Sequence, residues 1–387
     1  MDVQPHTSPT RRDADPASAG ASASTPALFV EKGTCHVVFA YEVGLSIDLD
    51  QAERHITSAT RRDSIKYKRR APQVEYRPAP LRLRTVVQCI SAGDFTTDAT
   101  VEYVIYDFGA VSVAYRIPLR ASLEHLLHLS DALYDNARLR ADSRHGVEQL
   151  VATIAPAIKR PFITDLVEDY VIFQVDAVTP AVGPREFVRD HAALLAQILR
   201  AELQPLAPEE INDATSCRLS YAVDDVAIID WNATFLLHGD VEDVIAVLEY
   251  ANVELLEMRH LDDQLDVALD QSYDTFARKG AARLYNVRSR SEELRRVAEM
   301  QIDSALLFEG VNNALKLLGD QFLARVYRAV ADRFHLPEWD ANIIRKLSTL
   351  ESIYQKLSDK RSAHRMEVLE WIIIILIAVS ILITFVP

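Results

Sequence analysis

The sequence predicts an α+β protein in three parts: an N-terminal α/β head, a coiled-coil-like stalk of long antiparallel helices, and one C-terminal transmembrane helix. Runs of β-branched and aromatic residues alternate with helical stretches over residues 29–238. Residues 240–386 hold one proline and three glycines, so long helices can form there. Residues 371–386 are apolar except for one serine and one threonine, which is typical of a membrane span.

Length and composition exclude several classes of protein. The 387 residues, of which 49% are hydrophobic, suffice for one large domain or two ordinary ones, and they argue against wholesale disorder. The 11 glycines are too far apart for a P-loop, a dinucleotide-binding fingerprint or a nucleophile elbow. Cys35, Cys89 and Cys217 have neither disulfide nor zinc spacing and predict reduced thiols. We therefore expect no cofactor, no bound metal, no catalytic residues and no enzymatic activity.

The head, predicted over 29–238, contains two hairpin patterns. In the first, Thr100–Tyr106 and Val111–Ile117 flank a short turn that contains Gly109. In the second, Cys217–Val223 and Asp225–Trp231 flank Asp224. Further strands are predicted at 35–41, 81–90 and 170–178, and helices at 50–58, from Ser122 onward, at 147–158 and at 187–203. Residues 1–28 are rich in Ala, Pro, Ser and Thr and predict a disordered tail.

The stalk, predicted over 239–370, begins with a helix between Asp240 and Gly280, which is a natural stop. A second helix opens at Ser289 and later carries an apolar stripe from Val311 to Val330. The last helix has spacings of four, three, four and three, which form a heptad seam: Ile343, Leu347, Leu350, Tyr354 and Leu357. This seam can pack within the chain or between chains, and we expect a homo-oligomer.

The C-terminal segment over 371–386 predicts a tail anchor. A helix of this length spans roughly 24 Å, slightly less than the roughly 30 Å apolar core of a bilayer. The residues expected to hold it there are Trp371, Ile372, Leu376 and Phe385. Basic residues before the span, including Arg361 and Arg365, place the bulk of the chain on the cytoplasmic side. We therefore expect a single-pass protein of the bacterial inner membrane, or of the mitochondrial inner membrane in a eukaryote.

Several motifs resemble a known family. They are Pro337-Glu338-Trp339-Asp340, Leu350-Glu351 with Tyr354, Leu369 to Ile373 (LEWII), Tyr106 to Val111 (YDFGAV), and the helical stretch Ala251 to Tyr273. Together they are similar to the domain of unknown function 155 family, which includes the "required for meiotic nuclear division" proteins. The similarity extends over roughly residues 35–387.

The resemblance implies a membrane-associated protein with an α/β head and a helical, coiled-coil-prone C-terminal part. Members of that family are mostly mitochondrial inner-membrane proteins that support organelle translation, often as homo-oligomers. No agreed reaction is attached to the family, so the resemblance implies no catalytic residue. Two departures are visible: the chain has no transit peptide, and its span has Val379 and Ser380 where many members have an acidic residue.

Residues 61–84 are strongly basic, with nine Lys or Arg against Asp63 and Glu75. Such a segment can contact anionic lipid or RNA, or it can be a solvated loop. The residues predicted to contact anionic lipid or RNA come from this segment and from the region before the span: Lys66, Lys68, Arg69, Arg70, Arg361 and Arg365.

Two other groups of polar residues have ordinary explanations as well as functional ones. Asp224, Asp225 and Asp230 can form an acid–base or Mg²⁺ site, or they can be ordinary turn residues. His125 and His128 share a helical face but lack further metal ligands nearby.

The sequence thus predicts a membrane-anchored, non-enzymatic scaffold or adaptor that self-associates and presents its head to an unidentified protein partner. A membrane-tethered hydrolase or nucleotide-handling enzyme that uses the three aspartates is one alternative. A head that contacts RNA through the basic segment is another.

Overall fold

A computed structural model of the chain describes residues 28–56, 60–62, 79–238, 241–278, 321–353 and 355. The described strands form one nine-stranded sheet, in the order β11-β12-β13-β10-β1-β8-β7-β4-β3, and two small two-stranded sheets. Their bounds in the large sheet are β1 Phe29–Glu42, β3 Thr60–Arg62, β4 Leu81–Val86, β7 Thr100–Ile105, β8 Ala110–Ser122, β10 Val167–Thr179, β11 Arg218–Leu219, β12 Val226–Ile229 and β13 Ala233–Leu237. The small sheets pair β2 (Gly44–Ile47) with β9 (Ile158–Pro161) and β5 (Ser91–Ala92) with β6 (Phe95–Thr96).

The large sheet is mostly antiparallel, and β10 with β13 is its parallel pair among the described strands. At its centre β1 pairs with β8 on one side and β10 on the other, with His36 opposite Arg116 and Ile172. Side chains alternate between the two faces of a strand. On β1, Phe39 therefore joins the core of one face, while Val38 and Ala40 join the clusters of the other.

Helices α1 to α4 cover the first face of the sheet and contribute to its largest hydrophobic cluster. Their bounds are α1 Leu49–His55, α2 Leu123–Leu133, α3 Ala137–Ile154 and α4 Pro184–Arg200, and α5 (Pro208–Ala214) follows α4. Local sequence explains where two of them begin: the side chain of Ser122 accepts from the backbone of His125, and that of Asn136 from Leu139. The first face is therefore closed by amphipathic helices.

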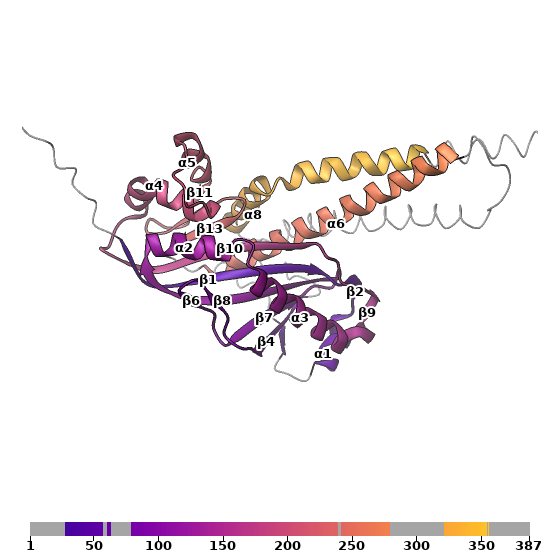
Figure 1. The fold of residues 1–387 in the computed structure, drawn as a ribbon, viewed down its shortest axis with the longest axis horizontal. Helices are drawn as coiled ribbons and strands as arrows, with labels where there is room; N and C mark the ends of the chain where they lie inside the picture. The colour runs from indigo at the N-terminus through magenta and orange to yellow at the C-terminus, as the bar shows by residue number, and fades with distance from the viewer. Residues whose placement is uncertain are drawn as a thin grey trace, which may run out of the picture.

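The second face is covered by α6 (Glu242–Arg278) and α8 (Gln321–Arg333). The first turns of α6 pack on the sheet in one cluster with Ile172, Ile229 and Leu236. At 37 residues, α6 is roughly 55 Å long and extends beyond the sheet beside the helix over 336–353 (Figure 1). The sheet and the helical part thus share one hydrophobic cluster, and the predicted boundary between 238 and 239 stays a prediction.

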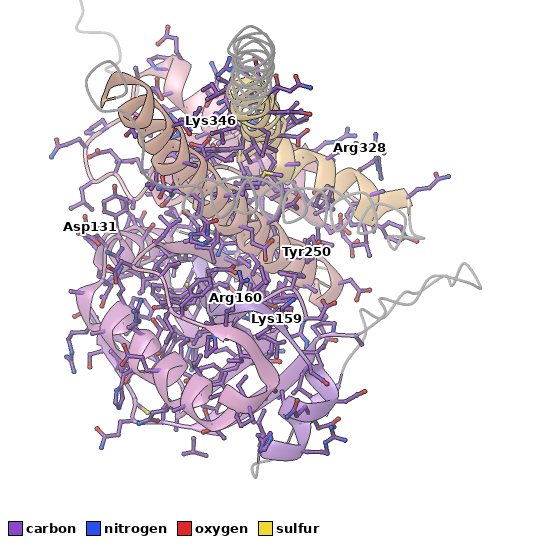
Figure 2. The ribbon with its side chains drawn as sticks, turned by 90° about the vertical axis from the view of Figure 1, so that its right-hand side faces the viewer. Asp131, Lys159, Arg160, Tyr250, Arg328 and Lys346 are labelled. Carbon is purple, nitrogen blue, oxygen red and sulfur yellow. The ribbon has the colours of Figure 1, made fainter. Side chains whose placement is uncertain are left out.

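Helix α6 and the helix over 336–353 run parallel; residues 279–320 between them lie outside the described residues, so the antiparallel arrangement of consecutive helices stays a prediction. Lys346 Nζ lies 2.7 Å from Asp262 Oδ1 and 2.6 Å from Asp266 Oδ1, while Asp340, earlier in its helix, interacts with Glu254, earlier in α6. Residue numbers therefore rise in the same direction along both helices, and Figure 2 shows Lys346 between them. An apolar seam defines a packing face but no direction, so the sequence alone does not fix how these two helices are oriented.

The heptad seam is used within the chain where it is described. Ile343 and Leu350 are buried, and Leu347 is half-buried, in the cluster that also contains Leu261 and Leu265 of α6. Of the two predicted alternatives, the seam therefore packs within the chain where it is described. The homo-oligomer stays a prediction. Both predicted hairpins are confirmed, as β7 with β8 and as β11 with β12.

The predicted membrane architecture is contradicted. Among the described residues, no helix combines the length and the apolarity that a bilayer crossing requires. The longest of them, α6, carries acidic residues throughout, so that every apolar run in it is interrupted. This finding corrects the fold class with a transmembrane helix, the tail anchor and the single-pass localisation. The segment assigned to these features, with Trp371, Ile372, Leu376 and Phe385, lies outside the described residues, as does the tail before residue 28.

Candidate functional site

A row of polar side chains crosses the second face of the sheet beside the N-terminal half of α6. We call it the polar strip; its members are Lys32 and His36 on β1, Arg82 and Arg84 on β4, Glu102 on β7, Arg116 on β8, and Gln174 and Asp176 on β10. The contacts form two groups, one around Glu102 and one around Gln174, which adjoin where His36 of β1 lies opposite Arg116 of β8.

Glu102 is the centre of the strip. Its carboxylate accepts hydrogen bonds from Arg82 at 3.1 Å, Arg84 at 3.2 Å and Arg116 at 2.9 Å. Burial raises the pKa of Glu102, but the three guanidinium groups outweigh burial and hold its pKa below the ordinary value. Glu102 is therefore ionised at neutral pH and accepts from three guanidinium groups, which disfavours its taking up a proton.

Arg82 connects the strip to α6. Its second terminal nitrogen lies 3.5 Å from Glu249 Oε2 on that helix, and Glu249 Oε1 accepts the hydroxyl of Ser112 at 2.8 Å. Burial raises the pKa of Glu249, and Arg82 opposes this rise. The contact fixes the position of the helix relative to the arginines.

The other arm of the strip begins at His36. Its Nε2 lies 3.1 Å from Gln174 Oε1, Gln174 donates to Asp176 Oδ1 at 2.9 Å, and Asp176 Oδ2 lies 3.5 Å from Lys32 Nζ. Burial lowers the pKa of His36, and Arg116 on the neighbouring strand lowers it further. His36 is therefore a neutral positioning group at neutral pH, and the arginines and Lys32 supply the positive charge.

The cations of the strip lie nearer to the solvent than the central carboxylate. The side chains of Lys32 and Arg84 are 77% and 62% exposed and that of Arg116 is 36% exposed, whereas that of Glu102 is 10% exposed. A guanidinium has five N–H donors, so an arginine that bonds one carboxylate keeps others free. The strip can therefore bind an anion through Arg84 and Arg116, with Glu102 holding both arginines from behind.

The structure describes part of the basic segment that the sequence singled out. Arg82 and Arg84 belong to it and lie in the strip, and the backbone register brings Arg61 of β3 opposite Arg82. The residues chosen from the sequence for anion contact lie outside the described residues: Lys66, Lys68, Arg69, Arg70, Arg361 and Arg365.

The three aspartates proposed as an acid–base site have separate roles. Asp225 accepts from the backbone of Tyr221 and Ala222 in the β11–β12 turn. Asp230, at the far end of β12, is fully buried, with Arg200 Nε 2.9 Å and Arg333 Nη2 3.5 Å away. This geometry gives Asp225 the role of an ordinary turn residue and makes Asp230 a link between α4 and α8.

The histidine pair does not form a metal site in the described part of the chain. His125 and His128 are exposed on α2, and His125 Nδ1 lies 3.0 Å from Ser122 Oγ. No group of three or more potential metal ligands occurs among the described residues.

Sequence reasoning missed Glu102, His36, Gln174 and Glu249. The available signal was a charged residue inside an apolar pattern: Glu102 interrupts the strand TVEYVI, and Glu249 lies on the apolar face of α6. Such residues are rarely buried unless they are paired, so each predicted a partner without identifying it.

The comparisons with known proteins place the sheet in a family. Residues 32–242, from β1 to the first residue of α6, match the family described as "Uncharacterized protein MJ0711, N-terminal domain". The chain is 23% identical over 201 residues to "Uncharacterized protein MJ0711" of Methanocaldococcus jannaschii. This match includes 51% of the present chain and 61% of that relative, so it spans less than two thirds of the relative's length. No solved structure matches. The match covers the whole polar strip and more than half of the chain, and the chain belongs to the family of the MJ0711 N-terminal domain.

Proposed function

We propose that this protein is a non-enzymatic binding protein whose polar strip contacts the phosphate backbone of RNA. The observation that supports the proposal is the convergence of Arg82, Arg84 and Arg116 on the recessed carboxylate of Glu102. Arginine forks match phosphate oxygens in geometry and charge, and backbone contacts dominate affinity for nucleic acids. The strip therefore offers a pre-positioned surface for a polyanion on a chain whose net charge is -14.

The same contacts favour binding over catalysis. Glu102 accepts from three arginines, and the Nε2 of His36 is engaged by Gln174. Neither group is poised to exchange a proton with a substrate, as a general acid or base must be. Two basic residues of the segment 61–84, Arg82 and Arg84, lie on the strip, which connects the sequence pattern to this site.

The resemblance to the domain of unknown function 155 family belongs to the same proposal. Most of its motifs lie in the C-terminal part and one, Tyr106 to Val111, lies in the β7–β8 hairpin, whereas the family match over 32–242 covers the sheet and α1 to α5. Translation takes place on RNA, so the support of organelle translation by members of that family is consistent with the function proposed for the strip.

The test compares RNA binding by two matched double variants in fluorescence anisotropy. Arg84→Gln with Arg116→Gln removes two exposed cations while leaving amide donors for Glu102. The control, Arg138→Gln with Arg189→Gln, removes the same charge from α3 and α4, on the opposite face of the sheet.

We expect the strip variant to bind a labelled single-stranded RNA about tenfold more weakly, and the control to bind nearly as the unmodified protein does. The slope of log Kd against log salt should fall by about 1.4, at about 0.7 for each lost phosphate contact. Equal weakening in both variants, or no binding by the unmodified protein at low salt, would contradict the proposal. Thermal unfolding of each variant separates lost binding from lost structure.

A further inference from the structure

The middle of α6 carries two buried glutamates, Glu254 and Glu257, that are incompletely paired. They are 5% and 8% exposed. Glu254 Oε2 accepts the hydroxyl of Tyr327 on α8 at 2.6 Å. Glu254 Oε1 and Glu257 Oε1 are buried and have no hydrogen-bond donor among the residues that the structure describes. A buried carboxylate oxygen without a donor costs several kcal/mol in its ionised form, so these atoms call for an explanation.

The groups that face the two glutamates are mostly acidic. Glu257 faces Glu42 at the end of β1 and Asp107 in the β7–β8 turn, and Glu254 faces Asp340 in the helix over 336–353. On β10, Glu168 faces α6 as well, but Arg259 of α6 is bonded to it. Among the described basic side chains, none is bonded to Glu254 or Glu257.

Like charges in a dry environment cannot all be ionised at once. Burial, with the nearby carboxylate of Asp340, raises the pKa of Glu254 to about 7, although Tyr327 opposes the rise. Burial and the carboxylates of Glu42, Glu254 and Asp107 raise the pKa of Glu257 well above its ordinary value. At mildly acidic pH the cluster therefore retains protons, and a protonated carboxyl can donate a hydrogen bond to a neighbouring one.

We propose that Glu254 and Glu257 form a proton-operated latch, which seats α6 against the end of β1 and the β7–β8 turn when protonated and releases this stretch of α6 when its protons are lost. The latch lies where α6 is packed between the sheet and the other helices. Tyr250, one turn before Glu254, packs toward the sheet (Figure 2), and Lys346 secures the same helix farther along to the helix over 336–353. Loss of the protons therefore loosens the part of α6 between Tyr250 and the contact with Lys346. Because Lys346 still joins α6 to the helix over 336–353, these two helices can move together.

The test is hydrogen–deuterium exchange of α6 in the full chain at about pH 5 and about pH 8, with rates corrected for the intrinsic pH dependence of exchange. The variant Glu254→Gln with Glu257→Gln keeps the shape of both side chains but cannot ionise. Asp270→Asn, at an exposed position of α6, is the control that removes one negative charge from the same helix.

In the unmodified protein we expect protection over 250–260 to fall about tenfold or more between the two pH values, whereas the double variant stays within about threefold. The Asp270→Asn control should behave as the unmodified protein does. Protection that is unchanged with pH in the unmodified protein, or that falls equally in the double variant, overturns the latch.

An infrared measurement on the unmodified protein keeps the proposal testable if the double variant fails to fold. Protonated carboxyl groups absorb separately from carboxylates, so the native protein at about pH 6.5 should show a protonated-acid band that is lost on denaturation. Absence of that band in the native protein would refute the latch by itself.

Discussion

At the scale of the residue, buried charge is the feature that decides most roles in this protein. Asp230 was grouped with Asp224 and Asp225 because the three are close in sequence. In the structure Asp230 is fully buried and holds two guanidinium groups, whereas Asp224 is exposed. Closeness in sequence therefore suggested a single site, but Asp230 is buried and Asp224 is exposed, so the aspartates do not form one.

We predict that Asp230→Ala lowers the free energy of unfolding by about 2–4 kcal/mol, because it leaves Arg200 and Arg333 without their buried partner. In the variant both arginines keep their contacts to Asp213, which is more exposed. Because these contacts remain, we expect the loss of unfolding free energy to stay below the upper end of the range for buried pairs. Urea denaturation measures the change. Asp224→Asn is the control, and its free energy of unfolding should stay within about 0.5 kcal/mol of that of the unmodified protein. Equal losses in the two variants would show that the buried contacts of Asp230 do not stabilise the fold.

At the scale of the element, the β7–β8 hairpin shows how one backbone position controls several strands. Gly109 has φ +113°, and a Cβ on it would lie 1.8 Å from the carbonyl oxygen of Gly44. The backbone of Val43 also donates to the carbonyl of Gly109. The turn thus serves the hairpin and the junction between β1 and β2 together.

We expect Gly109→Ala to lower the free energy of unfolding by about 3 kcal/mol or more, because a side chain is strained at this φ and collides with backbone. Gly183→Ala is a suitable control, since its φ of -70° suits alanine and nothing lies within 4 Å of the added Cβ. Thermal melting of the two variants should separate them clearly. A Gly109→Ala protein as stable as the control would disprove the steric argument.

At the scale of the whole molecule, buried acids on α6 and β10 make stability depend on pH. Burial raises the pKa of both Glu168 and Glu254 to about 7. The folded state then binds protons more tightly than the unfolded chain between about pH 4.5 and about pH 7, so these groups lose stabilisation as pH rises through that window. Glu102 has a lowered pKa and acts in the opposite direction, with stabilisation lost only as pH falls below its ordinary value.

The free energy of unfolding should therefore be greater near pH 5 than near pH 7.5, by roughly 2–3 kcal/mol for each of the two groups. Denaturation curves at several pH values test this. Glu168→Gln should reduce the slope between those values, because the variant cannot take up a proton there. A stability that increases steadily up to pH 7.5 would show that the buried acids do not control it.

The sequence by itself determined the mixed α and β composition, both hairpins and the long helix from residue 242. These features depend on local chemistry: alternating β-branched residues, a turn with Gly109, and apolar residues at helical spacing. It also marked Arg82 and Arg84 as part of a basic segment. Where a signal lies within about one turn or one strand, the neighbouring residues suffice to interpret it.

Only the tertiary structure decided how these elements meet. It set α6 parallel to the helix over 336–353 and brought His36, Glu102 and Arg116 together from three strands. It also separated Asp225 from Asp230 by burial. The direction of a helix, the register of a strand and the burial of a side chain depend on residues distant in sequence. Apolar periodicity, for example, is the same for either direction of a helix. The polar strip and the acidic cluster were therefore visible only once distant elements were seen to pack together.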